Sequence, residues 1–150
     1  MSQRTDERTP KRVELETYDK ILKLSAHVMS VCKPKENKPN NKHIPKRNAS
    51  VGKMLLDCCV EMGCDVLEAN TIYVGTNLNR AERIQNYLDR IELQTHARRL
   101  TFRMEHIFRM LFQDNPFAES TTKYMLELIC EVRGLLTAWR EADIKVSRSL

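Results

Sequence analysis

The chain has 150 residues, of which 41% are hydrophobic and 30% are charged, and its formal net charge is +5. This length fits a single domain with one core, and the low content of glycine (four) and proline (five) argues against a fold rich in turns. No apolar run approaches the roughly 18 residues of a membrane span, and residues 1–12 lack the apolar centre of a signal peptide. We therefore expect a cytoplasmic protein with no membrane partner.

The first 48 residues predict a tail, a helix and a long loop. Residues 1–12 are polar and are expected to be disordered. From residue 13 to residue 32, apolar side chains recur at three- and four-residue spacing, which predicts the first helix. Residues 33–48 contain three prolines and six Lys or Arg. The prolines exclude a helix, and a basic loop of this length between helices is expected to be either functional or disordered.

Two further helices are predicted in the middle of the chain. The second begins near Asn48 or Ser50, which are both good N-cap residues, and continues to about Tyr73. A break at residues 75–77 follows. Asn79 then caps a long third helix that runs from residue 80 to about residue 112.

The apolar residues of the third helix do not stay in phase. At 100° per residue, Ile84, Leu88 and Ile91 fall on one side. The later apolar residues fall roughly opposite, and a drift of about 20° per heptad is too small to explain the change. The helix therefore either bends near residues 92–96 or buries two different faces, and the second option implies a partner such as another subunit. The later residues are Ala97, Leu100, Met104, Ile107 and Leu111.

The fourth helix is expected from about residue 119 to residue 142, with residues 143–150 as a polar C-terminal tail. Its apolar residues, from Met125 to Trp139, define a core side. Four amphipathic helices predict an all-α fold. The economical arrangement is an antiparallel, up-down four-helix bundle over residues 13–142.

Positive charge is concentrated in two parts of the chain. Residues 1–49 carry twelve Lys or Arg against six Asp or Glu, and residues 76–113 carry seven arginines against four acidic residues. Clustered arginines suit a phosphate-bearing partner, and the start of a helix also attracts phosphate. The alternative is that these charges serve solubility alone. The candidate nucleic-acid contacts are Lys42, Lys46, Arg47, Lys53, Arg83, Arg90, Arg98, Arg99 and Arg109.

Phe102 is predicted to lie among the outward-facing arginines of the third helix. An aromatic ring between guanidinium groups can stack on a base or pack against another subunit. The remaining alternative is an exposed side chain without a partner.

No motif for catalysis is present in the sequence. Glycine-rich phosphate loops, G-x-S-x-G and H-E-x-x-H are all absent. The five cysteines form no C-x-x-C pair, and the four histidines are scattered. We expect reduced thiols and neither a catalytic centre, a metal site nor a cofactor.

Three motifs, taken in order, resemble one family. They are Tyr-Asp-Lys-Ile-Leu at residues 18–22, Ile-Pro-Lys-Arg-Asn-Ala-Ser-Val-Gly at residues 44–52, and Leu-Ile-Cys-Glu-Val-Arg-Gly-Leu-Leu-Thr-Ala-Trp at residues 128–139. With the arginine-rich third helix, residues 13–142 resemble the accessory variability determinant (Avd) proteins of diversity-generating retroelements. That family is related to four-helix-bundle proteins encoded in intervening sequences of bacterial 23S rRNA genes.

The resemblance implies a homopentameric barrel of four-helix protomers with a basic surface. It also implies binding to the retroelement reverse transcriptase and to template-repeat RNA and its cDNA. In the family the accessory protein supports mutagenic cDNA synthesis at adenines, and the polymerase active site lies on the reverse transcriptase. The resemblance would place the chain in the cytoplasm of a bacterium that carries such an element, on its own chromosome or on a phage.

By position, Pro45, Lys46 and Arg47 match the basic start of the family's second helix, and Glu131, Val132 and Trp139 match the signature of its last helix. Trp139 and Phe102 are accordingly candidate contacts to another subunit or partner. The sequence departs from the family pattern at Arg133 and Gly134, whose order is exchanged, and at residues 137–138, where the family has a glycine. The loop at residues 33–43 is also longer, and we hypothesise that its lysines add a contact to RNA or to the reverse transcriptase.

Two other functions stay open at this point. One is a structural or RNA-binding oligomer of the rRNA-intervening-sequence type, without a retroelement. The other is an enzyme, which the absence of motifs disfavours. A reverse-transcriptase gene and a pair of variable and template repeats beside this gene would distinguish the first alternative from the retroelement protein.

Overall fold

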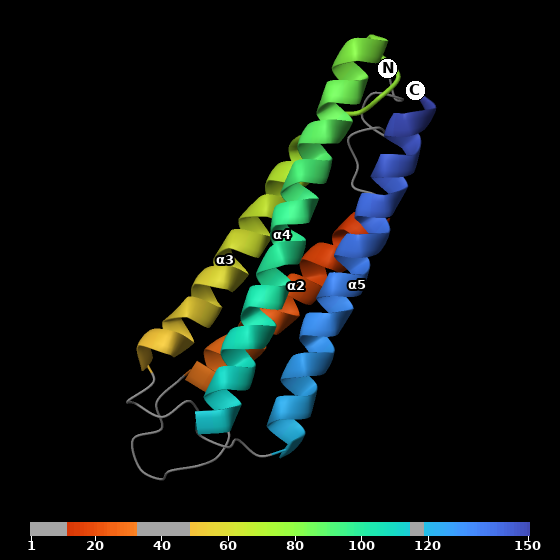
Figure 1. Ribbon diagram of the computed structural model, residues 1–150. Coiled ribbons are helices and arrows are strands. Elements are labelled where there is room, and N and C mark those ends of the chain that lie inside the picture. Colours follow the sequence, from red (N-terminus) through yellow and green to blue (C-terminus); the bar gives the residue numbers. More distant parts are fainter. Residues whose placement is uncertain (1–11, 33–48, 115–118) are drawn as a thin grey trace.

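The computed structural model describes residues 12–32, 49–114 and 119–150. These residues form helices α2 (Arg12–Cys32), α3 (Ala49–Thr71), α4 (Arg80–Asp114) and α5 (Glu119–Ser149), with no strand among them (Figure 1). For these residues, the prediction of four helices and no strand is confirmed. Residues 1–11 of the predicted N-terminal tail and the basic loop at residues 33–48 lie outside the described residues, and Arg12, predicted as the end of that tail, begins α2. No helix in the described part of the chain is long and apolar enough to cross a bilayer.

The predicted break between the second and third helices is confirmed. The last turn of α3 closes with a hydrogen bond from the Ile72 amide to the Ala69 carbonyl, 3.2 Å. The Asn79 side chain then accepts a hydrogen bond from the Glu82 amide at 2.8 Å. This is the N-cap geometry that satisfies a free amide in the first turn of a helix, so Asn79 sets the start of α4.

The helices pack as a ring around one core, in which α2 contacts α3 and α5, and α4 contacts α3 and α5. Residue pairs show that α4 and α5 run in opposite directions, because Arg90 bonds Asp143 while Arg133 bonds Thr101. The core is apolar over most of its length. Its largest fully buried side chains include Trp139, Phe108, Met62, Leu24 and Leu136.

The core side of α4 is continuous, which explains the change of phase seen in the sequence. Apart from Leu100 and Ile107, its buried positions follow heptad spacing, but Arg90, Gln94 and Thr101 occupy three of them. Ile84, Leu88 and Ile91 lie off this side, and Leu88 is 48% exposed. The apolar pattern shifts because polar residues fill part of the core stripe. That stripe is Tyr87, Arg90, Gln94, Ala97, Thr101, Met104, Phe108 and Leu111.

The prediction that the last helix ends near residue 142 is wrong, because α5 continues to Ser149. Asp143, predicted to begin a polar tail, is buried and accepts hydrogen bonds from Arg90 and Gln94. A buried partner on α4 therefore stabilises the part of α5 that the sequence alone predicts to be frayed. With this extension, α4 and α5 reach beyond α2 and α3 at one end of the bundle (Figure 1).

Candidate nucleic-acid interface

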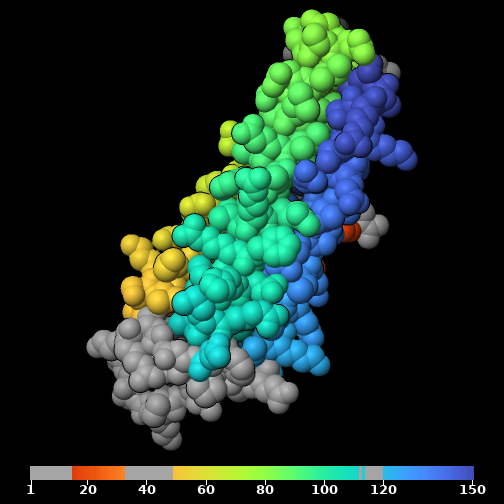
Figure 2. Space-filling model, viewed as in Figure 1, coloured from red at the N-terminus to blue at the C-terminus, as the bar shows by residue number. Residues whose placement is uncertain are grey.

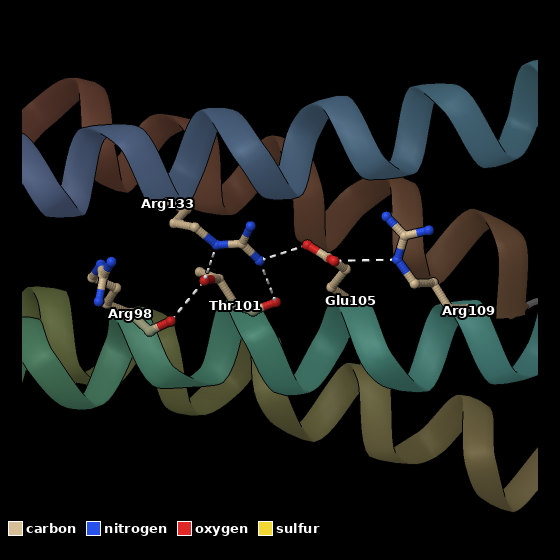
Figure 3. Close-up of polar contacts among 5 residues, drawn as sticks. All are labelled: Arg98, Thr101, Glu105, Arg109 and Arg133. Carbon is tan, nitrogen blue, oxygen red and sulfur yellow. Dashed lines mark hydrogen bonds and ion pairs between the residues drawn. The ribbon is translucent and has the colours of Figure 1, made fainter.

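The side chains of α4 and α5 meet along most of the length of the two helices (Figure 2). At the centre of this contact, the Thr101 hydroxyl is fully buried and donates to the Arg98 carbonyl at 2.6 Å. The same hydroxyl accepts a hydrogen bond from Arg133 Nε at 3.0 Å (Figure 3). Thr101 therefore joins an arginine of α5 to the backbone of α4.

Glu105 links two arginines on the same surface. Its Oε1 accepts from Arg133 Nη2 at 2.8 Å, and its Oε2 accepts from Arg109 Nε at 3.2 Å (Figure 3). The bond to Arg133, followed by the bond to Arg109, lowers the pKa of the Glu105 carboxyl below its usual value, although partial burial opposes this. The carboxylate thus stays ionised and fixes the direction of both guanidinium groups.

Two guanidinium groups lie against the ring of Phe102. The Cζ atom of Arg133 is 3.8 Å from the ring centroid, and the Cζ atom of Arg98 is 5.3 Å from it. Phe102 itself is 47% exposed. The ring is therefore held by cations while part of its surface is left open to solvent.

Positive charge exceeds negative charge in this group of residues. Arg98 Nε donates to the Thr137 hydroxyl at 2.9 Å, and Arg140 Nε donates to the Thr95 hydroxyl at 2.7 Å. These bonds to neutral hydroxyls orient the arginines without cancelling their charges. We call the group the arginine cluster, and it consists of Arg98, Phe102, Glu105, Arg109, Arg133 and Arg140. It contains four arginines and one carboxylate and is suited to an anion beside an aromatic surface.

The opposite side of α4, toward α3, has a different character. Arg99 lies here, in a hollow with the carboxylates Asp65, Glu68, Asp89 and Glu92. His96 Nδ1 contacts Asp65 Oδ2 at 2.5 Å, and burial raises the pKa of that carboxyl although the bond to His96 opposes it. Arg99 was predicted to contact nucleic acid, but its surroundings are acidic; this hollow meets the arginine cluster at Thr95, which also accepts the bond from Arg140.

The structure places the other predicted arginines in different settings. Arg109 belongs to the arginine cluster and its side chain is 62% exposed. Arg83 Nε donates to the Val74 carbonyl at 3.0 Å, so it ties the α3–α4 turn to α4. Of the predicted lysines, Lys53 is exposed on α3, away from the α4–α5 contact. Lys42, Lys46 and Arg47 lie outside the described residues.

Arg90 and Trp139 are buried, so neither can make the surface contact that was predicted for it. Arg90 is 5% exposed and forms an ion pair with Asp143, so its prediction as a nucleic-acid contact is wrong. Trp139 is 2% exposed, and the Arg90 Cζ lies 5.4 Å from its ring centroid. The candidate subunit contact at Trp139 is therefore a core residue of the protomer.

Arg133 and Arg140 were not among the contacts predicted from the sequence. Both come from α5, and they are seven residues apart, which places them on one side of the helix. That side borders the buried positions Val132, Leu136 and Trp139. The seven-residue spacing could have indicated these two residues, because arginines beside the core stripe of a helix lie where that helix meets its neighbour.

The chain matches no protein-family model, no curated protein and no solved structure. Within the described residues, no three His, Cys, Asp or Glu side chains are placed to share a metal ion. The functional conclusion therefore depends on the geometry of the arginine cluster together with the sequence resemblance.

Proposed function

We propose that this chain is a non-catalytic accessory subunit of a diversity-generating retroelement that binds nucleic acid through the arginine cluster. It binds template-repeat RNA and its cDNA together with the reverse transcriptase, and so supports mutagenic cDNA synthesis. The protomer is an up-down four-helix bundle that assembles into a homopentamer in the cytoplasm. The sequence resemblance supports the assignment to retroelement accessory proteins, and the arrangement of the arginine cluster supports its choice as the binding surface.

One observation carries the binding proposal: Arg133 and Arg98 lie against a half-exposed Phe102. A single-stranded nucleic acid offers stacked bases and a chain of phosphates, and proteins bind it by combining aromatic stacking with cationic side chains. Arg133 is positioned by Thr101 and Glu105, so little side-chain freedom is lost when a ligand binds. We expect recognition by charge and stacking, because phosphates and the faces of the bases are common to every nucleotide.

The test measures the binding of a labelled single-stranded RNA to the protein by fluorescence anisotropy, at two salt concentrations. The double variant Arg98→Ala/Arg133→Ala removes two cations from the cluster. Loss of two phosphate contacts should reduce the slope of log K against log salt by about 1.4. Affinity at low salt should fall by roughly tenfold or more, at about 1.4 kcal/mol per tenfold.

A matched control removes the same charge from the other side of α4. Arg99→Ala/Arg103→Ala changes two exposed arginines of the same helix, and it should leave most of the affinity and the slope in place. Equal losses in the two double variants would show that only net charge matters, and affinity independent of salt would rule out phosphate binding.

The neighbourhood of the gene, and not an RNA-binding measurement, distinguishes the retroelement protein from a protein of the rRNA-intervening-sequence type. A reverse-transcriptase gene with variable and template repeats beside this gene supports the retroelement protein. An rRNA intervening sequence as the site of the gene would support the alternative.

A further inference from the structure

The four arginines of the arginine cluster are attached to the protein in the same way. Each donates a hydrogen bond from Nε, the guanidinium nitrogen nearest the backbone. The acceptors for Arg98, Arg140, Arg133 and Arg109 are, in that order, the side chains of Thr137, Thr95, Thr101 and Glu105. A guanidinium held at Nε keeps its direction, so it can present its terminal nitrogens to a ligand in a fixed orientation.

The terminal nitrogens of these arginines are largely unused by the protein. Those of Arg98, Arg109 and Arg140 have no hydrogen-bond partner among the described residues. Arg133 also uses Nη2, which donates to the Thr101 carbonyl and to Glu105, and its Nη1 has no such partner there. The cluster therefore offers donors of the kind that bind phosphate oxygens.

The four guanidinium groups form a row along the α4–α5 contact. Arg140 lies at the level of Thr95, and Arg98 follows it on α4. Arg133 comes next, and Arg109 ends the row; Figure 3 shows Arg98, Arg133 and Arg109 in this order along α4. At 1.5 Å per residue, the 14 residues from Thr95 to Arg109 span about 21 Å. The positive charge is thus spread along a line.

The ring of Phe102 lies in the middle of this row, against Arg98 and Arg133. Its 47% exposure leaves room for the face of one base. In a double helix the faces of the bases are covered by the neighbouring base pairs, whereas a single strand can turn a base onto an aromatic side chain. The position of the ring therefore favours a single strand.

Glu105 is the one carboxylate within the cluster, and it lies below the level of the exposed cation beside it. Its side chain is 25% exposed, while that of Arg109 is 62% exposed. Both of its oxygens accept hydrogen bonds from arginines, one from Arg133 and one from Arg109. Two guanidinium groups thus offset its charge, and the row keeps a positive balance.

We propose that one continuous single strand lies along the α4–α5 contact, parallel to the two helices. Its phosphates bind Arg140, Arg98, Arg133 and Arg109 in that order, and one base stacks on Phe102. The phosphates of a stacked strand are about 3.4 Å apart along its axis and those of an extended strand are further apart, so the row covers about four to six nucleotides. The inference rests on the proposed nucleic-acid binding and adds the path, the length and the strandedness of the ligand.

The experiment measures affinity against the length of the ligand. Unlabelled oligouridylates of three to twelve nucleotides compete with a labelled twelve-nucleotide oligouridylate for the protein, and fluorescence anisotropy reports the competition. Affinity should rise by roughly tenfold or more between three and six nucleotides, and beyond that only in proportion to the number of registers. The slope of log K against log salt for the six-nucleotide ligand should be about −2.8, for four phosphate contacts.

A variant that shortens the row gives the sharpest result. Arg109→Ala/Arg140→Ala removes the two ends, so affinity should stop rising at a shorter length, about two nucleotides earlier, with a salt slope near −1.4. Arg99→Ala/Arg103→Ala is the matched control, since it removes two exposed arginines of α4 outside the row. It should leave the length dependence as in the wild type. Circular dichroism checks the fold, and Arg109→Gln/Arg140→Gln replaces the alanine variant if that one is unfolded.

A duplex tests the strandedness of the ligand. A twelve-base-pair RNA duplex should bind the wild type roughly tenfold more weakly than the twelve-nucleotide single strand, because its base faces are covered and cannot stack on Phe102. In Phe102→Ala the difference should become smaller. A duplex that binds as tightly as the single strand would overturn the proposal.

The length series also separates failure of this proposal from failure of nucleic-acid binding. If the end variant loses the same factor of affinity at every length, the arginines do not act as a row and the inference is wrong. The proposed function would still stand, provided that the wild type binds RNA and Arg98→Ala/Arg133→Ala weakens that binding. If no oligonucleotide binds the wild type, both are wrong.

Discussion

Arg90 on α4 and Asp143 on α5 form an ion pair inside the bundle, with Nε 3.0 Å from Oδ2 and Nη2 3.1 Å from Oδ1. Gln94 Nε2 donates to Oδ2 of the same carboxylate at 2.6 Å. The guanidinium also lies between two aromatic rings, 5.6 Å from the centroid of Tyr87 and 5.4 Å from that of Trp139. This pair fixes how α4 and α5 align.

Arg90→Met should lower the free energy of unfolding by about 3–5 kcal/mol, because it leaves the Asp143 carboxylate buried without its cation. Urea unfolding followed by circular dichroism measures the change. The double variant Arg90→Met/Asp143→Leu should recover part of the loss. Arg109→Met is the control, since it breaks an exposed pair with Glu105 and should cost no more than about 1 kcal/mol. A loss for Arg90→Met as small as that of the control would contradict a structural role for the buried pair.

Phe102→Ala should weaken the binding of single-stranded RNA, because the ring offers a stacking surface that alanine lacks. A loss of 1–3 kcal/mol per stacked base corresponds to roughly a 5- to 150-fold fall in affinity. The salt dependence should stay unchanged, since no cation is removed. Phe102→Trp should retain binding. Unaltered RNA affinity in Phe102→Ala would show that stacking does not contribute to binding and that the phosphate contacts account for it.

The stability of the bundle should fall as the pH drops below about 6.5, in part because of His27. Its Nε2 is buried without a hydrogen-bond partner among the described residues, its ring packs edge-on against Tyr124, and burial lowers its pKa from the usual 6.5. A histidine whose pKa is lower in the folded state is protonated more readily when unfolded, so protonation favours unfolding. Thermal unfolding of His27→Gln between pH 7 and pH 5 should show a weaker dependence on pH, and an identical pH profile would exclude His27.

The five thiols should separate into a slow and a fast group when treated with Ellman's reagent. Burial raises the pKa of Cys32 and of Cys59 to about 11, and it also raises the pKa of Cys58. Because the thiolate is the reactive form, these three should react slowly at pH 8. Cys64 and Cys130 are exposed, so two thiols should react quickly in native protein and five in denaturant. More than two fast thiols in the native protein would mean that the core opens easily.

Gly134→Ala should stabilise the protein by up to about 1 kcal/mol, because glycine inside a helix costs conformational entropy. A Cβ at this position would have no heavy atom within 4 Å, so alanine meets no clash in the protomer. Thermal unfolding measures the gain. A destabilised variant would indicate that another chain packs closely against α5 at this point, and sedimentation velocity would then show weaker assembly.

The helices were predictable from sequence because the apolar spacing and the capping residues agree. Asn79 illustrates this, since its side chain caps α4 where the sequence indicated. The end of α5 was not predictable, because Asp143 reads as a polar tail residue until Arg90 is seen to lie opposite it. Pairing across 53 residues of chain has no local signature.

The candidate surface was predictable only in part. Arg98, Phe102 and Arg109 were identified from their spacing on one helix. Predicting Arg133 would have required knowing which helix lies beside α4. Arg90 could not be distinguished from a surface arginine, because a charged residue in the core stripe of a helix looks, in the sequence, like an interruption of that stripe.

Because α4 and α5 project beyond the other two helices, local unfolding should cost less free energy at that end of the bundle than at its centre. Past Trp139, the register that pairs Lys20 with Glu131 leaves α5 with only α4 beside it among the described helices. Amide protons of α5 in this segment, which α2 does not cover, should exchange with deuterium sooner than those near the fully buried Met104. The ion pair of Arg90 and Asp143 stands at that boundary, and its loss should carry rapid exchange inward along both helices.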